Sequence, residues 1–158
     1  MKICVFSDSH GYAEHMIEAV RRENPTLCFF LGDGESDLVT LRSRFPELPI
    51  NSVRGNCDLR SVQPLVLNAV VAGVRIFAVH GHQHEVKYDD SLRELCRAAL
   101  RADADIVLFG HTHRPCLEHH LGMEVMNPGV IGRVRQPSYG LLTIEDGKLS
   151  PEIRYINS

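Results

Sequence analysis

The sequence lacks the features that would place the protein at a membrane or outside the cell. No apolar run approaches the length of a transmembrane helix. The first residues turn acidic at Asp8, too early for a secretory signal peptide. The five cysteines are odd in number and scattered, which fits reduced thiols better than a disulfide framework. We therefore expect a cytoplasmic protein with no membrane partner.

Neither sign of charge dominates. The chain has 17 Lys and Arg against 20 Asp and Glu, a net charge of −3. This balance, with no basic stripe in the sequence, disfavours nucleic acid as a partner. A chain of 158 residues with 44% apolar residues can bury a sizeable core without disulfides. We expect one domain over residues 1–158.

Short apolar runs alternate with segments of helical periodicity, which is typical of an α/β protein. Strands are predicted at 2–6, 27–31, 50–53, 64–71, 74–79 and 105–109, and helices at 13–23, 36–45 (capped by Ser36) and 90–102. Further short strands are expected at 122–126, 139–144 and 148–155, with turns at Ala72-Gly73 and Asp146-Gly147. The pattern predicts a mixed sheet or a pair of packed sheets covered by helices, with a parallel front half and a back half that forms a meander.

Polar residues and glycine follow five of the predicted strands. The segments are Ser7-Asp8-Ser9-His10-Gly11, Gly32-Asp33-Gly34, Gly55-Asn56-Cys57-Asp58, His80-Gly81-His82 and Gly110-His111-Thr112-His113. In open α/β sheets, ligands bind outside the carboxyl ends of the strands. The five segments can therefore meet at one place, where glycine lets the backbone approach a bound group closely.

Each segment taken alone has a simpler explanation. Asp8 can cap the following helix, and Gly-Asp-Gly is a common turn composition. The two histidine-rich segments are harder to explain as turns, since surface turns rarely bring imidazoles together. Because the simple explanations require five independent coincidences, the set favours a shared metal site.

The candidate ligands are two carboxylates, one amide oxygen and four imidazoles: Asp8, His10, Asp33, Asn56, His80, His111 and His113. Seven ligands exceed what one tetrahedral Zn²⁺ takes and suit two ions that share a bridging carboxylate. The mixed oxygen and nitrogen set favours Mn²⁺, with Zn²⁺, Fe, Co²⁺ or Ni²⁺ as alternatives, over Ca²⁺. Two ions about 3.5–4 Å apart form a clamp used for phosphoester hydrolysis, in which bound water ionises near neutral pH.

The ordered motifs Asp-x-His, Gly-Asp, Gly-Asn-x-Asp, His-Gly-His and Gly-His-Thr-His resemble those of the calcineurin-like metallophosphoesterases, and the small bacterial and archaeal phosphodiesterase branch above all. The resemblance runs from residue 3 to about 130. It implies a four-layer αββα sandwich of two mixed sheets flanked by helices, and attack on phosphorus by a hydroxide between two divalent ions. It also implies that Asp8, His10 and His113 hold one ion. Asn56, His80 and His111 would hold the other, and Asp33 would bridge.

The sequence departs from the family pattern at two positions. Cys57 stands where many members carry a histidine that is thought to protonate the leaving group. A thiol is a poorer general acid, which favours substrates with good leaving groups such as aryl esters, or protonation by water. The alternative interpretation of Cys57, as a small partly buried residue, fits the sequence at least as well. Val130 replaces the serine that often ends the Asn-Pro-Gly-Ser turn.

Further roles are assigned to residues beside the ligands. We predict catalytic roles for Asn56, Asp58 and His82, with Asp58 orienting a neighbouring group. Substrate contacts are predicted for Arg54, Cys57 and His82, although Arg54 can equally form a surface ion pair and His82 can lie in a solvated loop.

The function predicted from the sequence is a metal-dependent phosphodiesterase acting on a small phosphoester. One alternative is a non-catalytic scaffold, since a retromer subunit with this fold is regarded as a binding platform. Others are a phosphomonoesterase and a nuclease. All seven ligand positions are present, so the sequence shows no decay of the site. A homodimer or homotetramer is compatible with this prediction.

Overall fold

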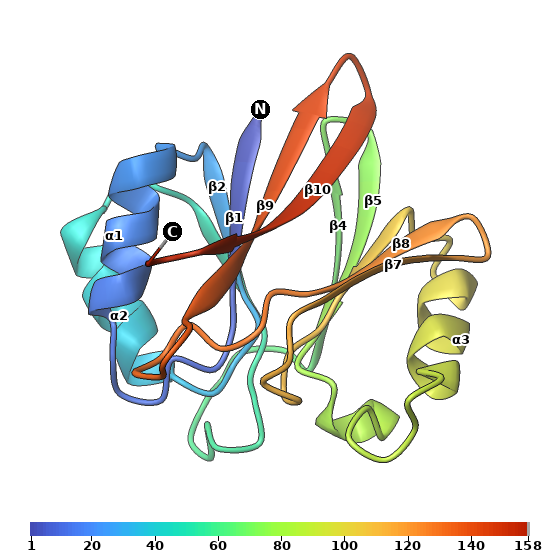
Figure 1. Ribbon diagram of the computed structural model, residues 1–158, viewed down its shortest axis with the longest axis horizontal. Helices are drawn as coiled ribbons and strands as arrows, with labels where there is room; N and C mark the ends of the chain where they lie inside the picture. Colours follow the sequence, from blue (N-terminus) through green and yellow to red (C-terminus); the bar gives the residue numbers. More distant parts are fainter. Residues whose placement is uncertain (158) are drawn as a thin grey trace.

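Two five-stranded sheets form the middle of the computed structural model, which describes residues 1–157 (Figure 1). The first sheet has the order β10-β9-β1-β2-β3, with β1 (Lys2–Phe6), β2 (Leu27–Phe30), β3 (Ile50–Ser52), β9 (Ser138–Glu145) and β10 (Lys148–Tyr155). The second has the order β4-β5-β6-β8-β7, with β4 (Val66–Val71), β5 (Val74–Val79), β6 (Ile106–Leu108), β7 (Cys116–His120) and β8 (Met123–Asn127).

Helices cover the outer face of each sheet, so the molecule has four layers (Figure 1). Helices α1 (Glu14–Glu23) and α2 (Glu35–Arg44) lie on the first sheet, and α3 (Arg93–Arg101) lies on the second. The single-turn 3₁₀ helix η1 (His82–His84) follows β5. The αββα architecture implied by the family resemblance is confirmed. Among the described residues, no helix has the length and apolar character needed to span a membrane.

The alternation of side chains along β1 shows how the layers are held together. Ile3 and Val5 point into the apolar layer between the sheets, and Cys4 and Phe6 point toward α1. All four side chains are fully buried, and burying one such apolar side chain contributes about 1.5–3 kcal/mol. Because β1 is buried on both faces, it fixes the position of the loop that follows it.

The predicted meander in the back half is wrong. Strands β7 and β8 form a hairpin in the second sheet, whereas β9 and β10 cross to the first sheet, where β9 pairs antiparallel with β1. The reason lies in β9 itself. Tyr139 and Leu141 pack toward the helices and Leu142 and Ile144 pack between the sheets, so β9 is buried on both faces, as a central strand must be.

Two predicted helix starts also differ from the structure. The residue that precedes α2 is Gly34, so Ser36 lies inside the helix and does not cap it. Helix α3 begins at Arg93, after a turn in which the carboxylate of Asp89 accepts hydrogen bonds from the backbone N–H groups of Ser91 and Arg93. The Ala72-Gly73 and Asp146-Gly147 turns are confirmed as hairpin turns.

Candidate metal centre

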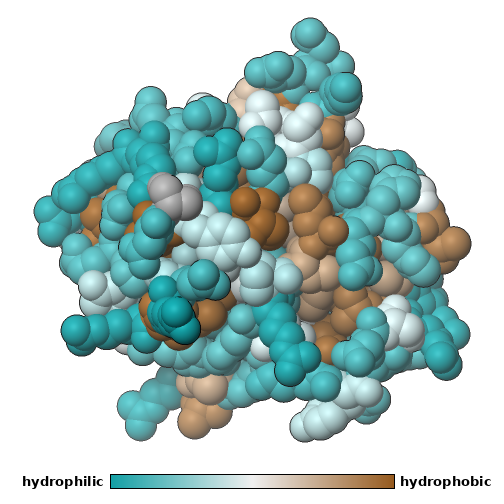
Figure 2. Space-filling view, in the orientation of Figure 1, coloured by the Kyte–Doolittle hydropathy of each residue, from teal (hydrophilic) through white to brown (hydrophobic). Residues whose placement is uncertain are grey.

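The seven predicted ligands lie on loops that leave the same edge of both sheets. Strands β1, β2 and β3 run parallel in the first sheet, and β5 and β6 run parallel in the second. Their carboxyl ends lie at the lower edge in Figure 1, where η1 and the connecting loops are also found. In the same orientation this edge is mostly hydrophilic at its surface, with small apolar spots (Figure 2).

Glycine lets these loops approach one another more closely than a residue with a Cβ would allow. Gly32 has a φ of +96°, and a Cβ built on it would lie 2.3 Å from the backbone nitrogen of Gly55. A Cβ on Gly110 would lie 1.9 Å from the Ser7 Oγ. These two glycines therefore allow the loops to approach one another.

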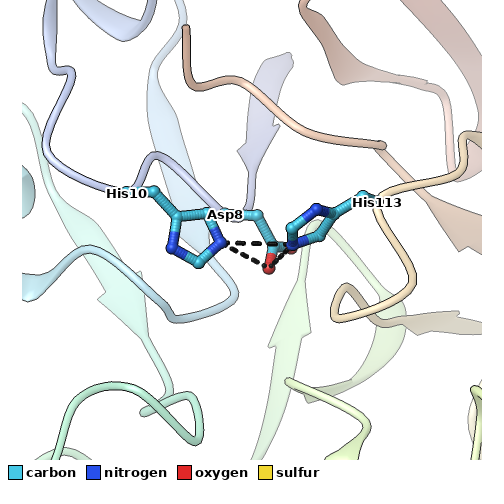
Figure 3. A group of neighbouring side chains, drawn as sticks. All are labelled: Asp8, His10 and His113. Carbon is cyan, nitrogen blue, oxygen red and sulfur yellow. Dashed lines mark hydrogen bonds and ion pairs between the residues drawn. The ribbon is translucent and has the colours of Figure 1, made fainter. Parts of the chain in front are cut away.

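One group of ligands consists of Asp8, His10 and His113 (Figure 3). The Asp8 Oδ1 lies 3.0 Å from the His113 Nε2 and 3.5 Å from the His10 Nε2, and the two imidazole nitrogens are 3.1 Å apart. Asp8 is fully buried, whereas the side chains of His10 and His113 are 38% and 44% exposed. The group is thus buried at its carboxylate and open to solvent at its imidazoles.

Only one of the two carboxylate oxygens of Asp8 accepts hydrogen bonds from ordinary donors. Its Oδ2 accepts hydrogen bonds from the Ser7 hydroxyl and from the backbone N–H of His111. Its Oδ1 is buried and has no hydrogen-bond donor. Although burial raises the pKa of Asp8, the neighbouring imidazoles of His10 and His113 lower it well below its usual range. Asp8 therefore presents an ionised, unsatisfied oxygen to the imidazoles.

A second group consists of Asp33, His80 and His111, with Asn56 beside it. The His80 Nε2 lies 3.3 Å from the Asp33 Oδ2, 3.2 Å from the His111 Nδ1 and 3.1 Å from the Asn56 Oδ1. The Asp33 Oδ1 accepts a hydrogen bond of 2.8 Å from the backbone N–H of Cys57. The structure therefore brings all seven predicted ligands together.

Asp33 lies between the two groups. Its carboxylate is within 4.8 Å of the His80 and His111 nitrogens, and also within 4.8 Å of a His10 nitrogen and the Cys57 sulfur. Burial raises the pKa of Asp33, but its contact with His80 outweighs burial and lowers the pKa to about 2. The side chain is ionised at neutral pH and lies within reach of histidines of both groups.

These residues fit a metal centre on their own chemistry. The His80 Nδ1 lies 2.7 Å from the carbonyl oxygen of Leu31, which it can meet only as an N–H donor, so loss of the second ring proton leaves a lone pair on Nε2 that points into the site. Burial, followed by the charges of His80 and Lys87, lowers the pKa of His111 to about 4, so the His111 ring is neutral at pH 7. Carboxylate oxygens and imidazole nitrogens that converge in this way suit divalent cations.

The three predicted substrate residues lie around the ligands in different ways. Cys57 is exposed, and a cavity of about 320 Å³ beside it is also lined by His10 and Asp33. The His82 ring lies 5.5 Å from that of His80, and its Nδ1 is buried without a hydrogen-bond partner. Arg54 is half-buried, and its Nη1 donates to the carbonyl oxygen of Ser61 at 3.5 Å.

Asp58, for which we predicted a catalytic role, contacts backbone. Its Oδ2 accepts hydrogen bonds from the N–H groups of Asp33 at 2.7 Å and Gly55 at 2.8 Å. Its Oδ1 accepts from the N–H of Gly34 at 3.0 Å, just before α2, and from the N–H of Glu35 at 3.1 Å, the first residue of α2. Asp58 thus caps α2 from a distance and fixes the position of Asp33.

Two residues that the sequence analysis missed hold the other ligand loops. Asp37 accepts hydrogen bonds from the Ser9 hydroxyl and the N–H of Gly11, on either side of His10. The Asn127 side chain is buried and donates to the carbonyl oxygen of Gly110 at 2.9 Å, which lies next to His111. The sequence signals were weak, since acidic residues are common in the first turn of a helix and Asn-Pro-Gly is a common turn.

Comparison with known proteins shows the family. The model of the calcineurin-like phosphoesterase superfamily domain matches residues 1–147, and the chain therefore belongs to this family. It is 33% identical over 150 residues to the probable metallophosphoesterase YsnB of Bacillus subtilis, covering 92% of this chain and 86% of that protein. The structure of a conserved uncharacterized protein of Streptococcus pneumoniae, described as a predicted phosphoesterase, matches with a TM-score of 0.80 and 27% identity, covering 99% of this chain and 90% of that one.

Two more distant structures share the fold. Vps29 of Entamoeba histolytica, in complex with Zn²⁺, has a TM-score of 0.76 and 21% identity and covers 99% of this chain and all of that one. A structure described as a novel archaeal phosphodiesterase has a TM-score of 0.70 and 23% identity and covers 98% of this chain and all of that one. At these identities the likeness concerns the fold. Membership of the family indicates a hydrolase that binds divalent metals.

Proposed function

We propose that the protein is a phosphodiesterase that holds two divalent cations, Mn²⁺ foremost, with the seven ligands and hydrolyses small phosphoesters. The observation that carries the proposal is the position of Asp33 between two ligand groups. Asp8, His10 and His113 lie on one side, and His80 and His111 on the other. When bound, such cations neutralise phosphoryl oxygens and lower the pKa of water.

The residues around the ligands suit a substrate with a good leaving group. Burial, followed by the charge of Asp33, raises the pKa of Cys57, so its thiol stays protonated and is a weak proton donor. Burial and the charge of His80 lower the pKa of His82, which keeps that imidazole neutral near pH 7. A neutral His82 carries one N–H that can donate a hydrogen bond to a phosphoryl oxygen. Neither group is a strong acid for an alkoxide.

The openness of the site favours a diester. Two of the ligands, His10 and His113, are more than a third exposed, and a diester has two arms that must leave the site in different directions. The archaeal neighbour described as a phosphodiesterase supports the same substrate class. The second candidate function is that of a metal-binding scaffold without catalytic activity. It is supported by the fold that this chain shares with Vps29.

Hydrolysis by wild type and the Asp33→Asn variant tests the proposal. Wild type with Mn²⁺ should cleave bis(p-nitrophenyl) phosphate faster than p-nitrophenyl phosphate, and Asp33→Asn should lose at least about 100-fold in kcat/KM because a charged ligand is removed. Asp146→Asn, in the exposed β9–β10 turn, is the matched control and should keep full activity.

Two outcomes would contradict the proposal. If Asp33→Asn kept the metal content and rate of wild type, Asp33 would not be the bridging ligand. If wild type bound two metal ions per chain and cleaved neither ester, the scaffold would be the better account.

A further inference from the structure

A second cavity lies beside the metal centre and has no role in the function proposed above. Its volume is about 570 Å³, within the range of about 300–1,000 Å³ that is typical of sites for small molecules. One side is formed by the loop between η1 and α3, which carries Lys87 and Tyr88. The other is formed by the loop between β6 and β7, which carries Thr112 and Arg114.

The cavity shares a loop with the metal ligands. Thr112 and Arg114 line it, and the residues that alternate with them, His111 and His113, belong to the two ligand groups. The Thr112 Oγ1 accepts a hydrogen bond from the Arg114 N–H at 3.2 Å, which stiffens this segment. A substrate arm that leaves the ligands across this loop would reach the cavity. The smaller cavity beside Cys57 lies on the β2 and β3 loops, where a second arm can leave.

The walls of the cavity differ in chemistry. Its floor is apolar, since Val86, Leu92 and Phe109 are buried. Tyr88 is 88% exposed at the rim, so its ring is accessible for stacking with a ligand. The cavity is therefore suited to a flat aromatic group that packs on the floor and on Tyr88.

Charged groups of both signs complete the rim. Lys87 and Arg114 are exposed cations that can pair with a phosphate. Asp90 and Glu118 are exposed carboxylates, which accept hydrogen bonds from amino, imino or hydroxyl groups and repel a ligand that carries only negative charge. A nucleoside joined to phosphate offers all the matching groups: a flat base, N–H and hydroxyl donors, and an anion.

We propose that this cavity is a subsite for the nucleoside arm of a phosphodiester, with Tyr88 stacking on the base. This inference rests on the proposed function for the position of the phosphorus. It narrows the substrate class to small diesters with one nucleoside arm, in which the bond to the other arm is hydrolysed.

Two substrates with the same leaving group provide the kinetic test. Thymidine 5′-(p-nitrophenyl) phosphate and methyl p-nitrophenyl phosphate both release p-nitrophenolate, and they differ only in the retained arm, which in the methyl ester has no ring to stack. Tyr88→Ala should lower kcat/KM for the thymidine ester about tenfold, mainly through KM, because stacking on one base is worth about 1–3 kcal/mol. Activity on methyl p-nitrophenyl phosphate should stay within about twofold of wild type, because its retained methyl arm makes no stacking contact worth that energy.

Three further variants sharpen this comparison. Tyr88→Phe keeps the ring and should retain the wild-type preference. Arg114→Ala should weaken use of the thymidine ester, whereas Arg101→Ala removes an exposed arginine from α3, outside the cavity, and should change neither substrate. Equal losses on both substrates in Tyr88→Ala, or no loss on either, would overturn the inference.

A binding measurement separates this inference from the proposed function. Thymidine 5′-monophosphate is titrated calorimetrically into chelator-treated wild type and into chelator-treated Tyr88→Ala. Binding to wild type that weakens about tenfold in the variant supports the subsite even if the protein hydrolyses no ester. Absence of binding to wild type, or equal affinity for both proteins, overturns the subsite even if the protein is a phosphodiesterase.

Discussion

Asp58 illustrates how single residues define the metal centre without facing it. Its carboxylate accepts four backbone hydrogen bonds, from Asp33, Gly34, Glu35 and Gly55. These donors belong to the loop after β2, the first turn of α2 and the loop after β3. One side chain therefore ties the position of Asp33 to the loop that carries Asn56.

Replacing Asp58 should damage both stability and metal binding. Asp58→Ala leaves four N–H groups without their acceptor, and we expect the free energy of unfolding in urea to fall by about 3 kcal/mol. Asp58→Asn keeps one acceptor oxygen and should lose less. Glu47→Ala removes an exposed carboxylate in the turn after α2 and serves as the control. Wild-type stability and Mn²⁺ affinity in Asp58→Ala would show that these bonds contribute little.

The convergence of the seven predicted ligand side chains was predictable at the residue level, and the residues that support them were not. Asp8, Asp33 and His80 each follow a buried strand closely in the sequence. The local sequence pattern therefore predicts that all three lie at the carboxyl edge of the sheets. Asp37 and Asn127 contact loops 15 or more residues away in the chain. Such partners depend on how the elements pack, which no local pattern in the sequence encodes.

The loops between the elements hold the ligands in an unusual backbone conformation. Five ligands have φ angles in the left-handed region: Asp8 at 57°, His10 at 46°, Asp33 at 61°, His111 at 66° and His113 at 60°. This conformation costs a residue with a Cβ about 1–2 kcal/mol. The backbone conformation that directs these side chains into the site therefore lowers local stability.

A comparison of glycine with alanine measures this cost. With chelator present, His113→Gly should be more stable to urea than His113→Ala by about 1 kcal/mol, because only glycine adopts a φ of this sign without a steric penalty. At the exposed position Glu18 inside α1 the order should reverse, with glycine about 1 kcal/mol less stable than alanine. The same order at both positions would show that the left-handed backbone at His113 costs nothing.

At the level of elements, the strands that carry the site were predicted, since each is a short apolar run ended by glycine or a polar residue. The placement of β9 and β10 in the first sheet was not. The pairing of β9 with β1 joins residues more than 130 positions apart, as Val5 and Gly140 show. The start of α2 was misplaced because its cap, Asp58, comes from another loop.

The whole molecule forms the centre by joining two sheets. The first sheet supplies Asp8, His10, Asp33 and Asn56, and the second supplies His80, His111 and His113. The apolar layer between the sheets keeps the two halves in register. A single domain over residues 1–158, a cytoplasmic location and a homodimer or homotetramer stay predictions.

Metal affinity should fall as the pH is lowered. The hydrogen bond with Asp8 raises the pKa of His10. Burial alone would lower the pKa of His80, but Asp33 and Asp8 raise it. Both imidazoles of the metal-free protein thus keep their protons to a higher pH than an ordinary histidine, whose pKa is about 6.5. Since a cation must displace these protons, affinity is lost as the pH falls through the raised values.

Calorimetric titration with Mn²⁺ between about pH 8 and pH 6, a range that spans the ordinary histidine pKa, measures this effect. We expect weaker binding at the lower pH and release of protons on binding, detected as a dependence of the heat on the ionisation enthalpy of the buffer. Equal affinity at both ends of the range would contradict the raised pKa values.

Anomalous diffraction from crystals grown with Mn²⁺ tests the central claim most directly. We predict two peaks about 3.5–4 Å apart, one beside Asp8, His10 and His113 and the other beside His80 and His111, with Asp33 touching both. Peaks elsewhere on the surface, or none at this edge of the sheets in crystals of an active protein, would contradict the account.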